Sequence, residues 1–210
     1  MKKIILAVIF SLTVISSVHP QSNFSAELDG GVIIPFKSYG GLQGKLQMNY
    51  LCFADDYLYA SLSYSSWDRN KLVIYDPSGQ TFNALYSEYN HTLYSFFLGN
   101  RFVFFKHKTF SLFNDVELGY QNLNYTRLFP QRLVNSDGRV EYLADYSKQK
   151  DITESLFGLG IVLGLKNSIT EKVDLMISTK LNSYINSSFH GLFGSANTNA
   201  GVTCGFIYDL

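Results

Sequence analysis

The sequence predicts an all-β protein, an eight-stranded antiparallel up-and-down transmembrane β-barrel, and three observations lead to this prediction. Apolar and polar residues alternate with period two in eight separate segments, as in strands with unlike faces. Aromatic residues gather at the ends of the apolar faces. The connections between the segments alternate in length. A barrel that crosses a membrane accounts for all three.

The N-terminal segment is typical of a secretory signal peptide. Two lysines precede a short apolar run over residues 4–15, and small residues follow. The run is shorter than the roughly 20 apolar residues that a membrane-spanning helix needs. We therefore expect residues 1–22 to be a signal peptide, cleaved somewhere within residues 17–22, and residues 23–210 to form one outer-membrane β-barrel domain.

The first four expected strands lie in the N-terminal half of the chain. They are residues 24–34, 42–50, 57–64 and 94–102. Their alternating apolar sets include, in order, Leu28 and Val32, Leu42 and Leu46, Leu58 and Leu62, and Phe96 and Leu98. Serine, glycine, glutamine and charged residues fill most of the intervening positions, so each strand has one apolar face.

The last four expected strands follow the same rule. They are residues 110–121, 154–165, 173–182 and 199–210. Their apolar sets include, in order, Val116 and Leu118, Ile161 and Leu163, Leu175 and Ile177, and Val202 and Phe206. The eight apolar faces contain no charged residue, which predicts one continuous uncharged surface.

A soluble barrel and a transmembrane barrel share this alternation but place the faces differently. The first buries its apolar face, whereas the second turns it to lipid. Only 16% of residues are charged and the net charge is zero, whereas a solubilising surface is about a quarter to a third charged. The expected aromatic girdles are Tyr64, Tyr94 and Tyr120 at one end, and Tyr50, Phe102, Phe110 and Tyr208 at the other. The composition favours the membrane and argues against nucleic-acid binding.

The connections favour an even-stranded barrel whose short turns face one side of the membrane. Short connections are expected at residues 53–56, 105–108 and 166–171, and also at 37–41. Long ones are expected at residues 67–91 and 126–151, and one of intermediate length at 186–198. In outer-membrane barrels the short turns are periplasmic and the longer loops extracellular.

One of the long connections contains its own hairpin signal. A turn sequence runs from Asn135 to Arg139 between two stretches of strand-forming residues. The hairpin would prolong the barrel above the membrane. Tyr142 and Tyr146 could present to a ligand or partner there, or the hairpin could be merely solvated.

These features resemble the small eight-stranded outer-membrane β-barrels of Gram-negative bacteria, including the OmpA membrane domain, OmpX-like proteins and porin-family barrels. The resemblance implies an outer-membrane location with both termini in the periplasm, and contact with outer-membrane lipid and lipopolysaccharide. It also implies that Phe206, Tyr208 and Leu210 form a signal read by the barrel assembly machinery, although Leu210 stands where the family usually has phenylalanine. It implies no particular function.

Charged residues on the inward faces form a candidate lumen network. They are Glu27, Asp29, Lys45, Arg101, Asp115, Glu117, Glu154, Asp174 and Lys180. Buried charges must be paired or hydrated, and eight strands enclose only enough space for side chains. We expect these residues to fill the lumen by pairing; the alternative is a gated ion path through them.

Two cysteines fall on the outward faces of the second and eighth strands. Cys52 and Cys204 would be separated by two strand spacings, about 10 Å, beyond disulfide reach. We expect two free thiols.

The histidines leave an enzymatic alternative open. His91 has Ser87 and Glu88 nearby, and His190 is near Ser187, Ser188 and Ser195. Small barrels that modify lipid A use Ser/His chemistry, in which a base must reach a hydroxyl and an acid must orient the base.

The expected function is nevertheless non-enzymatic. It is a structural or adhesive role, or docking to an envelope protein partner through the long extracellular loops. The alternatives are lipid A deacylation or acyl transfer, and a narrow, low-conductance pore. No metal, phosphate-loop or haem motif occurs in the sequence, so no cofactor is expected.

Overall fold

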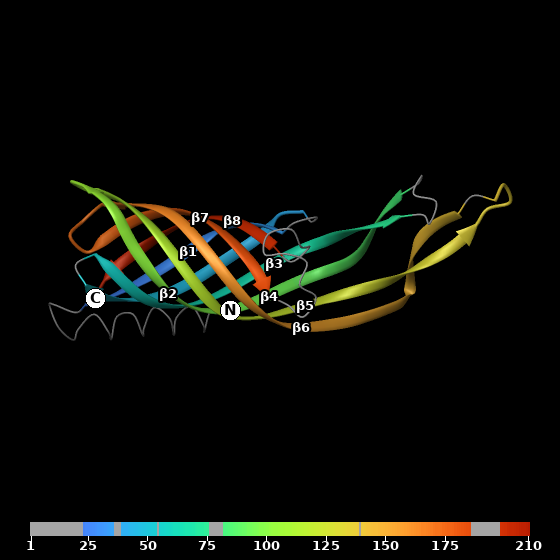
Figure 1. Cartoon of the computed structure of the whole chain (residues 1–210), viewed down its shortest axis with the longest axis horizontal. Coiled ribbons are helices and arrows are strands. Elements are labelled where there is room, and N and C mark those ends of the chain that lie inside the picture. Colours follow the sequence, from blue (N-terminus) through green and yellow to red (C-terminus); the bar gives the residue numbers. More distant parts are fainter. Residues whose placement is uncertain (1–22, 36–38, 54, 76–81, 139, 186–197) are drawn as a thin grey trace.

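The computed structural model describes residues 23–35, 39–53, 55–75, 82–138, 140–185 and 198–210. They form eight strands (Figure 1): β1 Phe24–Pro35, β2 Gly41–Phe53, β3 Asp56–Tyr75, β4 Phe82–His107, β5 Phe110–Val134, β6 Val140–Ser168, β7 Val173–Ile185 and β8 Thr198–Asp209. The expected signal peptide, with its cleavage site, lies outside the described residues. Among the described residues, no helix is long and apolar enough to cross a membrane.

Each strand pairs antiparallel with its neighbours in sequence, and β1 pairs with β8 to close a barrel. The closing register runs from Ser25 opposite Asp209 to Pro35 opposite Asn199. The backbone amide of Leu210 also donates to the carbonyl of Phe24, at 3.1 Å. The predicted fold class, an eight-stranded antiparallel barrel, is confirmed.

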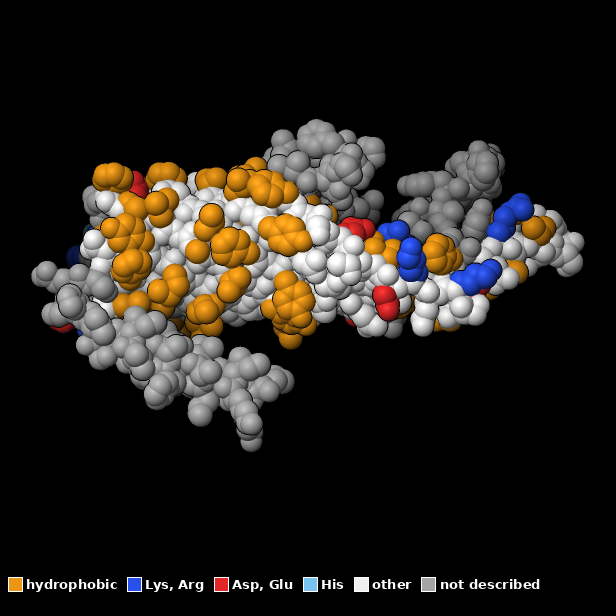
Figure 2. Space-filling view, turned by 90° about the horizontal axis from the view of Figure 1, so that it is seen from below, with side chains coloured by type: hydrophobic (Ala, Val, Ile, Leu, Met, Phe, Trp, Pro, Cys, Tyr) orange, Lys and Arg blue, Asp and Glu red, His pale blue; other side chains and the backbone are white. Residues whose placement is uncertain are grey.

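The apolar positions of the alternation face outward. Leu62 is 58% exposed and Phe206 is 54% exposed, whereas Ser61 and Ile207, which adjoin them in sequence, are buried. Hydrophobic side chains accordingly cover the visible face of the barrel, and charged side chains appear mainly beyond it (Figure 2). An exposed belt of this size would be a liability in water and is what a lipid-facing barrel requires.

The inward face is less uniformly polar than the alternation predicts. Two apolar clusters lie inside the barrel. One contains Phe113, Val162, Met176 and Ile207, with Val103 packed against it. The other contains Ile33, Trp67 and Leu93, with Leu123 and Tyr184 packed against it. The alternation does not predict these inward apolar residues, because it assigns apolar residues to the outer face.

The strands also extend further than expected at one end. Residues 67–91 were expected to be a long connection, but β3 continues to Tyr75 and β4 begins at Phe82, with the two strands paired up to that point. The hairpin expected in the next connection is present, as β5 and β6 pair up to Val134 opposite Val140. These paired extensions project beyond the barrel (Figure 1), and we call this end the hairpin end.

Tight turns close the opposite, short-turn end. Phe53 and Asp56 pair across the β2–β3 turn, and Lys108 adopts a left-handed conformation (φ 48°) between β4 and β5.

At the hairpin end, Gly138 also adopts a left-handed conformation (φ 81°) at the tip of the β5–β6 hairpin, where its amide donates to the carbonyl of Asn135 at 2.9 Å. Left-handed backbone favours glycine, which explains the Asp-Gly pair at that tip.

Both cysteines are free, as expected, and Cys204 is exposed on the outer face of β8. Alkylation of the denatured, non-reduced protein should therefore add two adducts, detected by mass spectrometry. A protein that takes up no alkylating reagent would contradict this arrangement.

Barrel closure depends on the last residues of β8. Deleting residues 206–210 removes their pairing with the start of β1 and of β7, and leaves edges that lipid cannot solvate. Refolding into detergent micelles should then yield no heat-modifiable band on a gel. Leu210→Ala keeps every backbone group and should refold normally. A deletion variant that refolds like the full chain would contradict a closed β1–β8 seam.

Candidate functional site

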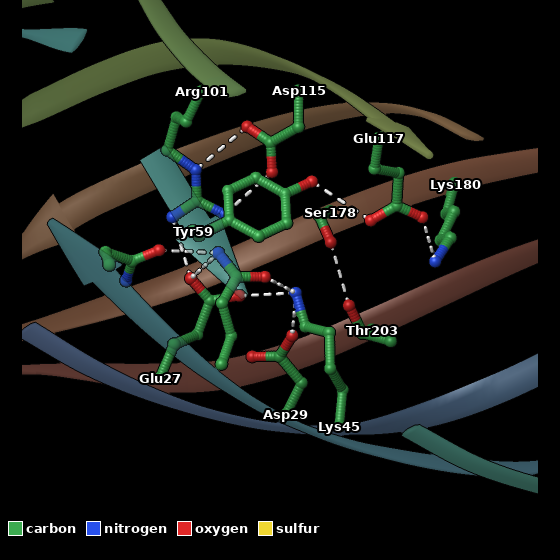
Figure 3. A network of polar contacts seen from close by, with 12 residues as sticks. Glu27, Asp29, Lys45, Tyr59, Arg101, Asp115, Glu117, Ser178, Lys180 and Thr203 are labelled. Atoms are coloured by element: carbon green, nitrogen blue, oxygen red, sulfur yellow. Dashed lines mark hydrogen bonds and ion pairs between the residues drawn. The ribbon is translucent and has the colours of Figure 1, made fainter. Parts of the chain in front are cut away.

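The interior of the barrel is organised around one arginine. Arg101, on β4, reaches across the lumen to Glu27 on β1, with Nη1 donating to Oε2 at 2.7 Å. Its Nε and Nη2 atoms donate to the two carboxylate oxygens of Asp115 on β5, both at 2.9 Å. The guanidinium carbon also lies 4.0 Å from the ring centroid of Phe113. Arg101 therefore ties opposite walls of the barrel together (Figure 3).

Lys45 on β2 extends the network along the wall. Its ammonium contacts the second carboxylate oxygen of Glu27, and Asp29 at 2.8 Å, and donates to Gln47 Oε1 at 2.9 Å. Gln47 in turn donates to Glu27 and Asn49, at 3.3 Å and 2.6 Å. Glu27, fully buried, is thus contacted by two cations and one amide.

A second group lies on β3, β5 and β7. Lys180 pairs with Glu117, whose other oxygen accepts a hydrogen bond from the Tyr59 hydroxyl at 3.0 Å. Lys180 also lies 4.2 Å from the ring centroid of Phe97. Tyr59 lies flat against β4 because residue 99 is glycine: a Cβ there would stand 2.3 Å from the tyrosine ring.

Seven of the nine predicted lumen residues lie in this central network, and two lie apart. Asp174 pairs with Lys166 at 2.8 Å. Glu154 accepts a hydrogen bond from Tyr125 at 2.7 Å, towards the hairpin end. In the central network, four carboxylates (Glu27, Asp29, Asp115 and Glu117) face three cations (Lys45, Arg101 and Lys180), which leaves one excess negative charge.

Neutral polar residues complete the interior; the alternation predicted their inward position, but not the hydrogen bonds between them. Ser178 and Thr203 share a hydrogen bond of 2.8 Å between β7 and β8 (Figure 3), and Gln121 donates to Ser95 at 3.1 Å. Each has a partner on the neighbouring strand. The pairing register, once known, would have identified them, because short polar side chains that face each other across inward positions are in hydrogen-bond reach.

Two small cavities flank the network in the part of the barrel that the structure describes. A cavity of about 10 Å³ lies at the short-turn end, lined by Ser25, Asn49 and Arg101 among others. Another, of about 170 Å³, lies at the hairpin end beside Trp67 and His91. They share no lining residue, and the charged network lies between them. The interior is therefore a packed core of ion pairs, consistent with the small lumen of an eight-stranded barrel.

The structure describes only some of the residues that could carry out Ser/His chemistry on lipid A. His91 is buried, and its Nε2 lies 3.7 Å from a Glu88 oxygen, but neither ring nitrogen has a hydrogen-bond partner among the described residues. Ser187, Ser188, His190 and Ser195, and the side chain of Ser87, lie outside the described part. Within the described part, no cluster of three or more His, Cys, Asp or Glu side chains could hold a metal ion.

Known proteins share the fold of this chain but not its sequence. No known protein family matches it, and no curated protein matches it. Neisserial surface protein A (NspA) superposes with a TM-score of 0.55 at 15% identity, over 90% of this chain and 98% of that one. A major outer membrane protein from Thermus thermophilus gives 0.55 at 12% identity, over 88% and 98%.

At such identities the likeness concerns the fold alone. The chain has the fold of the small outer-membrane β-barrels, as its alternation, girdles and connection lengths predicted.

The central network should dominate the stability of the barrel. Arg101→Met removes one cation from two buried carboxylates, and breaking a buried pair by losing one partner costs about 3–5 kcal/mol. We expect that loss in the free energy of unfolding, measured by urea titration in phospholipid vesicles.

The control is Lys106→Met at the short-turn end. Lys106 pairs with Asp55 at 2.8 Å on the surface, where a hydrogen bond from its ammonium to Asp55 raises the lysine pKa. An exposed pair of this kind contributes less than about 1 kcal/mol. Equal effects of the two substitutions would contradict a network that holds the barrel together.

Proposed function

We propose that this protein is an integral barrel of the Gram-negative outer membrane with a non-enzymatic role: it uses its projecting hairpins for adhesion or for docking to an envelope partner. The observation that carries the proposal is the extension of β5 and β6 beyond the apolar belt. Phe129, Val134, Leu143 and Tyr146 are about half exposed or more on this hairpin, and Tyr146 reaches 70%. Exposed apolar side chains outside lipid are available for contact with another protein.

The orientation follows from the two ends of the barrel. Because the strand number is even, Phe24 and Leu210 meet at the short-turn end. Short turns face the periplasm in barrels of this class. We therefore place both termini in the periplasm and the hairpins outside the cell. The aromatic girdle nearer the hairpins, which contains Tyr64, Tyr94 and Tyr120, would then meet lipopolysaccharide.

The final strand supports a role in biogenesis as well. Phe206 lies outward on β8, with Tyr208 and Leu210 at the alternate positions after it. An alternating apolar C-terminal strand fits recognition by the barrel assembly machinery. The same residues then face lipid after insertion.

A packed interior argues for this role over a pore. The interior cavities of about 170 Å³ and 10 Å³ lie on opposite sides of the ion-pair network. Reconstitution into planar bilayers should therefore give no unit conductance above the baseline. Stable single-channel steps would favour the pore alternative instead.

The enzymatic alternative has a separate readout. A lipid A deacylase or acyltransferase needs a hydroxyl within hydrogen-bond reach of its base, and His91 has no such partner among the described residues. Mass spectrometry of lipid A from cells with and without the gene should give identical acylation patterns. A change in acyl number would overturn the non-enzymatic proposal.

The hairpin itself provides the direct test. Replacing residues 129–148 by Asn-Gly joins Leu128 to Gln149, which face each other in the register, through a two-residue turn. Cells that display this variant should lose the adherence and cell–cell aggregation conferred by the full-length protein, at equal surface levels and with a normal heat-modifiable band.

The matched control shortens only the hairpin tip. Replacing residues 135–139 by Asn-Gly retains Phe129 and Tyr146, and should retain adherence. Full adherence after loss of residues 129–148 would contradict the proposed role of the hairpin.

A further inference from the structure

The cavity at the hairpin end has a lining unlike the rest of the interior. It measures about 170 Å³ and lies inside the mouth of the barrel, where β1 and β3 to β8 each contribute to its wall. Its lining includes the side chains of Trp67, Glu88, His91, Arg127, Glu154 and Thr198. Aromatic, acidic and hydrogen-bonding groups therefore converge on one small space, as in ligand sites.

A stack of rings forms one wall of this cavity. The His91 ring lies between Trp67 and Tyr125, with centroid distances of 4.9 Å and 5.1 Å and interplanar angles of 9° and 11°. Arg127 lies 5.3 Å from the Tyr125 ring centroid. The imidazole faces are thus covered, and only its edge, with the two nitrogens, is free to take part in hydrogen bonds.

Those two nitrogens are buried without a hydrogen-bond partner in the described part of the chain. His91 is 1% exposed, and neither Nδ1 nor Nε2 makes a hydrogen bond to any described residue. The buried Thr198 hydroxyl on the same cavity likewise has no hydrogen-bond partner there. Unpaired buried polar groups are costly, and a molecule in the cavity could supply the partners that the described residues do not.

The charges of the lining select the kind of partner. Arg127 donates to Glu88 Oε1 through Nε at 3.0 Å and Nη2 at 2.8 Å, and to the Tyr125 hydroxyl at 2.6 Å. The positive charge of Arg127 therefore offsets the negative charge of Glu88. The carboxylate of Glu154, which accepts from Tyr125 at 2.7 Å, adds a negative charge that forms no ion pair with a cation among the described residues of the lining.

We propose that this cavity binds a small protonated primary amine of about the size of an amino sugar. An ammonium group offers three N–H donors and no acceptor. The lining offers a matching set: a ring nitrogen of His91, the Thr198 oxygen and the Glu154 carboxylate. The volume of about 170 Å³ is many times the roughly 10–15 Å³ that a single water needs, so the cavity admits a molecule of sugar size. This site goes beyond the hairpin's proposed partner role and is independent of it.

The chain contains its own reporter for this site, because Trp67 is its single tryptophan and stacks on His91. We would titrate the folded barrel in detergent micelles with glucosamine, glucose and glucuronate, which share a ring size and differ in charge. Glucosamine should change the tryptophan emission saturably, at concentrations about tenfold or more below those at which glucose acts, a difference of about 1.4 kcal/mol. Glucuronate should produce no saturable change.

Two substitutions localise the binding. Glu154→Gln keeps an acceptor for Tyr125 but removes the charge, and should abolish the preference for glucosamine over glucose. Glu171→Gln makes the same chemical change at an exposed position of the short-turn end and should leave it intact. If Glu154→Gln fails to fold, the series of three sugars on the unaltered chain decides alone.

Three outcomes would contradict the proposed amine site. Equal responses to glucosamine and glucose, or a preference for glucuronate, would overturn the proposal. A flat emission titration would be followed by saturation-transfer NMR from the protein to glucosamine C–H protons, and no transfer there would overturn it too. None of these results bears on adherence through the β5–β6 hairpin, so the two proposals fail separately.

Discussion

The backbone pairing of β1 with β8 is the constraint on which the rest of this structure depends. Lipid offers no hydrogen bonds to an open strand edge, so a sheet in a bilayer has to close on itself. Closure gives every strand two neighbours and divides each strand into an outward and an inward row. The apolar belt and the charged interior follow from that one requirement.

Closure also creates an interior too narrow for bulk water. Charged side chains placed there have to be compensated by one another, and the three-way contact of Arg101 with Glu27 and Asp115 does this across the lumen. Glycine at position 99 makes room for the Tyr59 ring beside it. Apolar clusters then lie at both ends, so the ion pairs are shielded and electrostatically stronger than surface pairs would be.

Period-two alternation was sufficient to predict the eight strands, their faces and the inward position of the charged residues. The alternation could not predict which charged residues pair with each other. Arg101 and Glu27 lie on β4 and β1, which are not neighbouring strands, and they meet only because the sheet curves into a closed barrel. The inward position of Phe113 and Met176 was not predicted, because the alternation assigns polar residues to the inward face and apolar residues to the outward face. The stack of Trp67, His91 and Tyr125 could not be predicted, because the sequence pattern over residues 67–91 indicates a connection rather than paired strands.

The central claim is that the polarity of the barrel is inverted, with lipid outside and charges inside. A spin-label scan over residues 58–64 of β3, in a chain whose Cys52 and Cys204 are replaced by serine, tests it most directly. In vesicles, labels at Leu58, Ala60, Leu62 and Tyr64 should be accessible to dissolved oxygen, whereas labels at Tyr59, Ser61 and Ser63 should be accessible neither to oxygen nor to a polar nickel reagent. Outward labels that respond to the nickel reagent instead would contradict the account.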